Sequence, residues 1–178
     1  MVIEMKNLYI DFDGVIVDTI PAIYDYLASH GLTLKDKDGY SKDRDLFNQV
    51  SALIAAYDFE KLLNEVDEIN DAFKHIEQLT NSGKFKLHVL THINSLEEGI
   101  AKVKYIQTRL RGLTVIMVPK KLSKTQMVEP RNAILVDDYI GNLAEWQASG
   151  GHAILFNSEL QEKGYPVINS LNTLMELY

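Results

Sequence analysis

The stretch Leu8-Tyr9-Ile10-Asp11-Phe12-Asp13-Gly14 decides the fold predicted for this chain. Three apolar residues predict a buried strand, and two aspartates and a glycine follow within four residues. Asp13-Gly14 taken alone indicates only a turn. In an open parallel sheet, however, ligands bind in the crevice beyond the carboxyl ends of the strands, and Asp11 and Asp13 stand at such an end.

Further apolar runs, each bounded by polar or turn residues, predict the other strands of the sheet. They cover residues 85–90, 113–118, 133–136 and 153–156. The runs are continuous rather than alternating in polarity. This is typical of strands that are covered on both faces, as in a parallel sheet.

Helical patterns lie between these strands. Ser95 and Glu98 can form a capping box at the start of one helix, and apolar residues then recur at helical spacing, namely Ile100, Val103, Ile106 and Leu110. A second helix is predicted over 142–149, before Gly150, and a terminal one over 171–177. This alternation of strands and helices predicts a doubly wound, Rossmann-like α/β fold with a parallel sheet.

Residues 21–82 interrupt the alternation and predict an insertion. Helical patterns cover 22–28, 46–56 and 66–79, without a convincing strand, and Asp18 or Thr19 is predicted to cap the first helix. The polar segment 34–39 is predicted to be a surface loop. We therefore expect a small helical cap over 21–82, inserted after the first strand of a core domain made of 1–20 and 83–178.

Composition restricts the class of protein and its partners. With 46% hydrophobic and 24% charged residues, the 178-residue chain is expected to fold as an ordinary globular protein. Its formal charge of -7 disfavours long nucleic acid as a partner, whereas a small phosphorylated substrate is compatible with a cleft that holds a cation. The sequence contains no cysteine, which excludes disulfides and thiolate chemistry. No apolar stretch reaches membrane-spanning length, so we expect no membrane partner and a cytoplasmic location; the oligomeric state is left open.

Polar residues that follow the first four predicted strands are the candidate site residues. Thr91 follows the second strand, three lysines follow the third, and Asp137-Asp138 follows the fourth. Together with Asp11 and Asp13 they can meet in one cleft. Carboxylates at contact distance repel one another unless a cation compensates them. An all-oxygen set without sulfur or clustered imidazole favours Mg²⁺.

Such a site suits phosphoryl transfer. Asp11 would attack the phosphorus and form an aspartyl phosphate, while Asp13 would protonate the leaving oxygen and later accept a proton from water. Thr91 would hold a phosphate oxygen. His92, next to it, is interpreted as a loop side chain within reach of the substrate rather than as a base.

The motifs around these residues resemble those of the haloacid dehalogenase superfamily. Residues 11–19 (DFDGVIVDT) are similar to its first motif, 87–91 (LHVLT) to its second and 134–138 (ILVDD) to its fourth, with a lysine before the fourth strand as the third. The resemblance covers about residues 5–157 and implies a Mg²⁺-dependent phosphatase with Asp11 as nucleophile and Asp13 as acid/base. It also implies that Mg²⁺ is held by the Asp11 carboxylate, the Asp13 main-chain carbonyl and the pair Asp137-Asp138, with Asp137 favoured as the direct ligand.

The lysine of the third motif has three candidates. Lys124 lies at the usual distance ahead of the paired aspartates and is the first choice, with Lys121 second; Lys120 and Lys121 lie nearer the strand end. The predicted substrate-binding residues are therefore Thr91, His92, Lys121 and Lys124.

Two features narrow the expected substrate. The insertion stands where the family's first type of cap is found, which typically closes over small substrates. Residues 137–146 and the apolar run 154–156 resemble the 5'(3')-deoxyribonucleotidase branch, which implies a nucleoside or deoxynucleoside monophosphate. The aromatic residues of the cap either include a base-stacking platform or serve its packing: Tyr24, Tyr26, Tyr40, Phe47 and Tyr57.

Three alternatives to a phosphatase stay open. A receiver-like phosphoacceptor uses an acidic pair, a Thr or Ser and a lysine, but in the reverse order along the chain. A catalytically silent homologue that binds a ligand or partner through the cap has no chemical need for the full set of site residues. A phosphomutase shares the machinery, and the sequence does not separate it from a phosphatase.

Overall fold

The computed structural model describes residues 5–34, 42–157, 159–160 and 163–178. Its centre is a six-stranded sheet in the order β3-β2-β1-β4-β5-β6, in which every neighbouring pair is parallel. The strands are β1 (Lys6–Ile10), β2 (Phe85–Ile93), β3 (Thr114–Pro119), β4 (Ile134–Asp137), β5 (His152–Phe156) and β6 (Val167–Ile168). The predicted doubly wound α/β fold is confirmed, and β6 is the strand that the sequence did not predict.

Helices cover both faces of the sheet. Leu8 and Ile10 of β1 belong to one buried apolar cluster, which includes residues of α4 (Ala72–Asn81) and α5 (Leu96–Arg109). Tyr9 points to the opposite face and joins a second cluster with Trp146 of α6 (Ile140–Ala148). This alternation along β1 follows from the period of two in a strand. Burial of apolar surface on both faces is the main favourable contribution to folding of this core.

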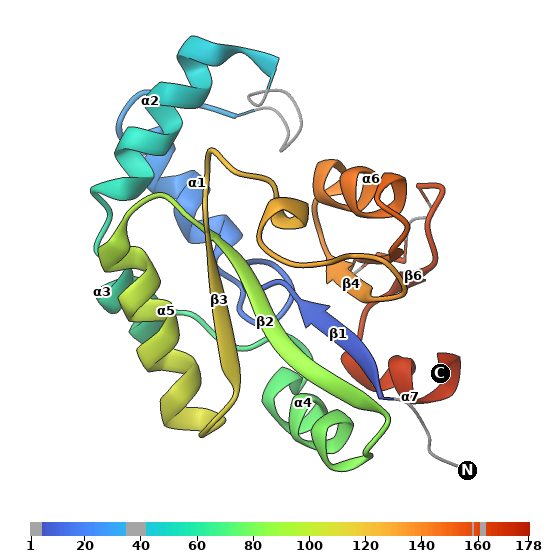
Figure 1. The fold of residues 1–178 in the computed structure, drawn as a ribbon. Coiled ribbons are helices and arrows are strands. Elements are labelled where there is room, and N and C mark those ends of the chain that lie inside the picture. The colour runs from blue at the N-terminus through green and yellow to red at the C-terminus, as the bar shows by residue number, and fades with distance from the viewer. Residues whose placement is uncertain (1–4, 35–41, 158, 161–162) are drawn as a thin grey trace.

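In the described part of the chain between β1 and β2, three helices precede α4. They are α1 (Ile20–Ser29), α2 (Arg44–Ala55) and α3 (Phe59–Glu65). Figure 1 shows α1 and α2 beyond the carboxyl ends of β2 and β3, as expected for a helical insertion after the first strand. The predicted surface loop 34–39 falls outside the described residues except for Leu34. The division into a core of 1–20 and 83–178 and a cap of 21–82 stays a prediction, although α4 at its boundary contacts β2.

The helix predicted over 66–79 is wrong in its first part. α4 begins only at Ala72, and the sequence analysis missed α3. The backbone between α3 and α4 pairs instead with the turn that follows β1: Asp18 N donates to Asp67 O, and Ile69 N donates to Ile16 O. Tertiary hydrogen bonds therefore override the local helical pattern in this segment.

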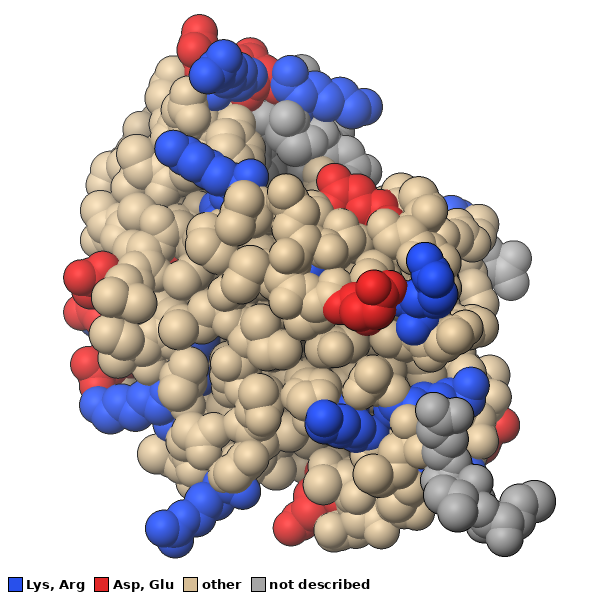
Figure 2. Space-filling view, viewed as in Figure 1, with Lys and Arg blue, Asp and Glu red and all other residues tan. Residues whose placement is uncertain are grey.

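Short helices complete the chain. The 3₁₀ helix η2 (Lys124–Gln126) lies between β3 and β4, and η3 (Leu171–Thr173) leads into α7 (Leu174–Leu177). In the part of the chain that the structure describes, no helix combines the length and apolar character needed to cross a membrane. Figure 2 shows basic and acidic side chains interspersed over one face, with broad uncharged areas between them.

Candidate active site

The pairing of β1 with β4 brings two predicted site residues side by side. Ile10 is in register with Val136, so Asp11 and Asp137 come next on adjacent strands. Asp11 N donates a hydrogen bond to Val136 O, which extends the ladder by one residue and fixes the position of Asp11. Parallel strands place both residues at the same edge of the sheet.

Three carboxylates gather at this edge. Carboxylate oxygens of Asp11, Asp137 and Asp138 all lie within 4.8 Å of one another, and Asp11 and Asp137 are buried. Three buried or half-buried carboxylates repel one another strongly when ionised. Oxygen donors of this kind fit a hard divalent cation such as Mg²⁺.

Asp137 is surrounded by donors from the protein. Its Oδ2 accepts hydrogen bonds from Lys124 Nζ at 2.6 Å and Asn142 Nδ2 at 2.9 Å, and its Oδ1 accepts from Tyr139 N at 2.9 Å. Asp138, by contrast, lines the cavity described below. Asp137 and Asp138 both belong to the carboxylate cluster around Asp11, and the choice of Asp137 as the direct ligand of a cation stays a prediction. Asn142 is a site residue that the sequence analysis missed.

Gly14 is required for Asp138 to approach the turn after β1. Its φ of +75° lies in the left-handed region, and a Cβ built there would stand 2.1 Å from Asp138 Oδ2. Any side chain at this position would push the Asp138 carboxylate away. Gly14 of the first motif therefore also leaves the space that Asp138 of the fourth motif occupies.

Lys124 joins the two strands electrostatically. Its Nζ lies 2.8 Å from Asp11 Oδ1 and 2.6 Å from Asp137 Oδ2, and its side chain is buried. Burial alone would lower the pKa of this ammonium, but the two carboxylates outweigh it and raise the pKa. For Asp11, burial has the opposite effect and raises the pKa to about 7. The charge of Lys124 opposes this rise, whereas the charge of Asp137 reinforces it. Of the three candidate lysines, the structure places Lys124 against the carboxylates.

Asp13 is held by two donors from different parts of the chain. Thr19 Oγ1 donates to Oδ1 at 2.7 Å, and Lys102 Nζ donates to Oδ2 at 2.5 Å. Burial would raise the pKa of this carboxyl, but Lys102 and Thr19 outweigh it and lower the pKa below its usual range. Thr19 stands at the N-cap of α1 as predicted, yet its side chain makes no capping hydrogen bond there. Its hydroxyl serves Asp13 instead.

Lys102 is the second site residue that the sequence analysis missed. It lies on α5 with its side chain fully buried. Besides Asp13, its ammonium donates to Glu98 Oε1 at 2.6 Å, His92 O at 3.0 Å and Thr91 Oγ1 at 3.3 Å. Burial would lower the pKa of Lys102, but the charges of Asp13 and Glu98 raise it, so the group stays a cation.

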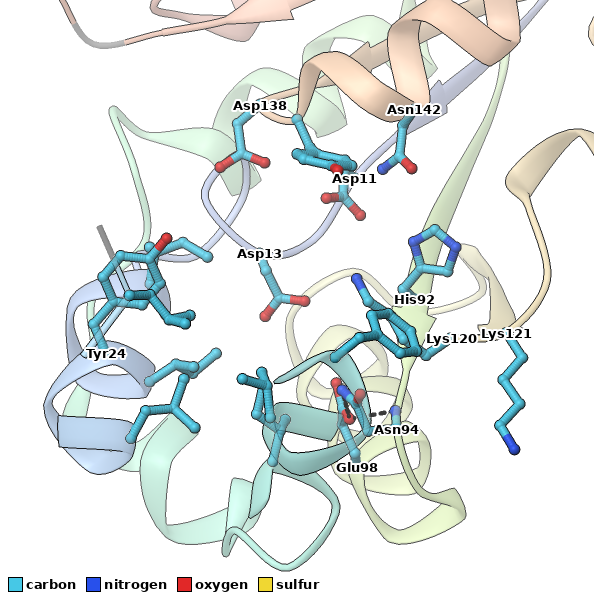
Figure 3. A pocket seen from close by; sticks show the side chains of 18 of the residues that line it. Asp11, Asp13, Tyr24, His92, Asn94, Glu98, Lys120, Lys121, Asp138 and Asn142 are labelled. Atoms are coloured by element: carbon cyan, nitrogen blue, oxygen red, sulfur yellow. Dashed lines mark hydrogen bonds between the residues drawn. The ribbon is translucent and has the colours of Figure 1, made fainter. Parts of the chain in front are cut away.

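The remaining predicted residues lie at different depths. Thr91 is fully buried and accepts a hydrogen bond from Lys102, whereas His92, Lys120 and Lys121 line the cavity. His92 contacts Leu122 O through Nε2 at 3.0 Å, and burial together with the nearby lysines lowers its pKa to about 4. Figure 3 shows the side chain of Lys121 extending away from Asp11 and Asp13.

A cavity of about 300 Å³ opens beside the carboxylates. Asp11, Asp13, Asp138 and Asn142 form its floor on the sheet side, and residues of α1 and α2 form its opposite wall. Figure 3 shows Asp13 facing the interior of this cavity, with Tyr24 of α1 across from it. A ligand of small size therefore has access to the carboxylates.

Comparisons with known proteins agree with this architecture. No family model matches the sequence, and no curated protein shows a significant match to it. Solved structures match over almost the whole chain. A haloacid dehalogenase-like family hydrolase from Streptococcus pneumoniae has a TM-score of 0.66 at 14% identity, covering 98% of this chain and 99% of the other. This chain has the fold of the haloacid dehalogenase-like hydrolases.

Two further structures with this fold are informative. A phosphatase of the same superfamily from Thermococcus onnurineus has a TM-score of 0.61 at 19% identity, with 97% of each chain covered. A putative hydrolase of the superfamily from Bacillus subtilis, bound to magnesium, has a TM-score of 0.61 at 15% identity, with 98% of each chain covered. At these identities the similarity concerns the fold.

Proposed function

We propose that this protein is a Mg²⁺-dependent phosphohydrolase that acts on a small phosphate monoester through an aspartyl phosphate on Asp11. One observation carries the proposal. The carboxylates of Asp11, Asp137 and Asp138 and the ammonium of Lys124 converge at the carboxyl edge of the sheet, where Asp11 faces a cavity. The chemistry of a carboxylate nucleophile beside a fixed cation is that of phosphoryl transfer.

The first step forms a bond between an Asp11 carboxylate oxygen and phosphorus, while the bond from phosphorus to the ester oxygen breaks. The proton needed by the departing alkoxide comes from Asp13, which faces the cavity two residues away. Lys124, 2.8 Å from Asp11, balances negative charge that gathers around the nucleophile. The products are the free alcohol and the aspartyl phosphate.

The second step returns the enzyme to its starting state. Water attacks the phosphorus, its proton passes to Asp13, and the bond between phosphorus and Asp11 breaks to release inorganic phosphate. Mg²⁺, when bound, would be held by Asp11, the pair Asp137-Asp138 and the main-chain carbonyl of Asp13, and would supply positive charge to the phosphoryl oxygens. Asp137 positions Lys124 and Asn142 beside it.

The test is release of inorganic phosphate from a panel of nucleotides, sugar phosphates and alkyl or aryl-alkyl phosphates, with and without Mg²⁺. A nucleoside monophosphate was the first expectation from the sequence and belongs in the panel. We expect turnover that requires Mg²⁺ and is lost in Asp11→Asn but kept in Asp25→Asn, a matched change at an exposed position on α1. Loss of the nucleophile should reduce kcat by at least about 10³-fold.

Other outcomes would point to the alternative functions. A long-lived aspartyl phosphate without turnover would identify a receiver-like phosphoacceptor. An isomerised sugar phosphate, in place of free phosphate, would identify a phosphomutase. Absence of any reaction across the panel would contradict catalysis.

A further inference from the structure

The wall of the cavity opposite the carboxylates is apolar. α1 contributes residues at positions i, i+3, i+4 and i+7, which lie on one face of a helix: Ile20, Ile23, Tyr24 and Leu27. α2 contributes Phe47, Val50 and Ile54 in the same manner, and Leu34 adds to them. Among the described residues of this wall, the Tyr24 hydroxyl is the only polar side-chain group.

The polar residues of the cavity come from the ends of the strands, the loop after β3, the first turn of α5 (Glu98) and the segment 138–145, and not from the wall formed by α1 and α2, apart from Tyr24. His92, Asn94 and Lys120 stand near the ends of β2 and β3, and Asp138 and Asn142 at the start of α6. Figure 3 shows Asp11 and Asp13 across the interior from Tyr24. A monoester whose phosphate reaches Asp11 therefore directs its organic group towards the wall formed by α1 and α2.

Such a wall discriminates by hydrogen bonding. A hydroxyl or a base edge buried against aliphatic side chains loses its hydrogen bonds to water and gains none in return. An alkyl or aryl group in the same place gains from the removal of apolar surface from water. A sugar or the ribose of a nucleotide carries several hydroxyl groups that would lose hydrogen bonds in this way.

We propose that the substrate is the phosphate monoester of a compact apolar or aromatic primary alcohol, which this site hydrolyses to the alcohol and inorganic phosphate. The inference rests on the proposed phosphohydrolase function and specifies its substrate class. The size of the cavity, about 300 Å³, stands at the lower end of the range for small-molecule pockets and favours a compact organic group. Phe47 and Ile54 are specificity residues in this account, because they contact the organic group and not the phosphate.

Three esters test the proposal: 2-phenylethyl phosphate, glucose 6-phosphate and adenosine 5'-monophosphate. All three are esters of primary alcohols, so their leaving oxygens are chemically alike. The three esters differ only in the organic group that the oxygen carries. We expect kcat/KM with Mg²⁺ to be at least about 10-fold higher for 2-phenylethyl phosphate than for the other two. Equal or higher values for glucose 6-phosphate or adenosine 5'-monophosphate would overturn the substrate class and leave the phosphohydrolase function intact. Turnover of none of the three would overturn both.

A variant of the wall gives an independent test. Phe47→Gln places an amide in the wall, and we expect it to lower the ratio of kcat/KM for 2-phenylethyl phosphate to that for glucose 6-phosphate about 10-fold. Phe47→Leu keeps the wall apolar and should preserve the ratio. Ala52→Gln adds the same amide at an exposed position of α2 and is the matched control. An unchanged ratio in folded Phe47→Gln, checked by thermal unfolding, would contradict the role of this wall.

Discussion

The ammonium of Lys102 lies 2.5 Å from Oδ2 of Asp13, although the two residues are 89 positions apart in the sequence. The Lys102 side chain is fully buried, and that of Asp13 is 20% exposed. This contact lowers the pKa of Asp13, so its carboxyl is ionised near neutral pH in the free protein. A proton donor must carry its proton when the ester bond breaks. We infer that approach of the phosphate dianion offsets the effect of Lys102 and allows Asp13 to be protonated.

Lys102→Met should destabilise the protein strongly. The substitution leaves Asp13 and Glu98 buried or half-buried without the cation that both contact. Removal of one partner from a buried ion pair costs about 3–5 kcal/mol. The measurement is urea unfolding at pH 7. Lys102→Met combined with Glu98→Gln removes one of the two unpaired carboxylates and should recover part of the loss.

Lys104→Met is the matched control for this prediction. Lys104 lies on the same helix and pairs with Glu60, but both side chains are 65% exposed. A surface ion pair contributes at most about 1 kcal/mol. If Lys102→Met and Lys104→Met lowered the free energy of unfolding equally, the prediction that the buried ion pairs of Lys102 contribute more to stability than an exposed pair would be wrong.

Thr19→Val should raise the pKa of Asp13. Valine has nearly the shape of threonine but donates no hydrogen bond, so Asp13 Oδ1 loses the contact at 2.7 Å. The ionised carboxylate then loses stabilisation that its protonated form does not need. We expect about 1–3 kcal/mol of destabilisation at pH 7. We also expect the basic limb of the pH–rate profile to move to higher pH, because Asp13 must be protonated to act as acid. Thr19→Ser keeps the hydroxyl and should leave both quantities near their original values.

The core of the fold was predictable because its strands are short, continuous apolar runs. Such a pattern defines a buried parallel strand from local sequence alone. The two-residue strand β6 has too few residues to form a pattern. The segment 66–71 was predicted to be helical because its residues suit a helix, whereas hydrogen bonds to the turn after β1 determine its structure.

The site residues that could be predicted from the sequence are those that directly follow a strand. Asp11 and Asp137 come together because β1 and β4 pair, and the motif order indicated this. The apolar pattern of α5 did not reveal Lys102, because burial in this helix does not follow apolar character alone: Ile100 is 57% exposed, whereas Lys102 is buried. The spacing of Glu98 and Lys102 by four residues was the available signal, but such pairs are common on exposed helix surfaces.

Gly14→Ala should weaken Mg²⁺ binding. The new methyl group collides with Asp138 Oδ2, which must move away from Asp11 and Asp137. Gly31→Ala is the control, since Gly31 has a φ of +80° and no atom within 4 Å of the added carbon. Both variants should lose about 1–2 kcal/mol of stability from the left-handed backbone. Only Gly14→Ala should raise the Kd for Mg²⁺ in calorimetric titration. Equal Kd values for the two variants would mean that Asp138 does not contribute to the cation site.

Mg²⁺ affinity should rise with pH up to about 7. Burial raises the pKa of Asp11 to about 7, and a carboxyl group must be ionised to bind the cation. A pKa raised by folding stabilises the folded protein below the usual carboxyl pKa, and this contribution is lost as pH rises through about 7. The cation-free protein should therefore become less stable from about pH 4 to pH 7, and saturating Mg²⁺ should offset that loss.

Calorimetric titration at several pH values measures this linkage directly. Because binding releases one proton, Kd should fall about 10-fold for each unit by which the pH rises towards 7, and it should stay constant above that pH. Asp11→Asn removes the titrating group, so binding to this variant should be weaker and should lose the step near pH 7. A Kd for the unsubstituted protein that does not change between pH 5 and pH 8 would mean that Asp11 is already ionised, with Lys124 outweighing its burial.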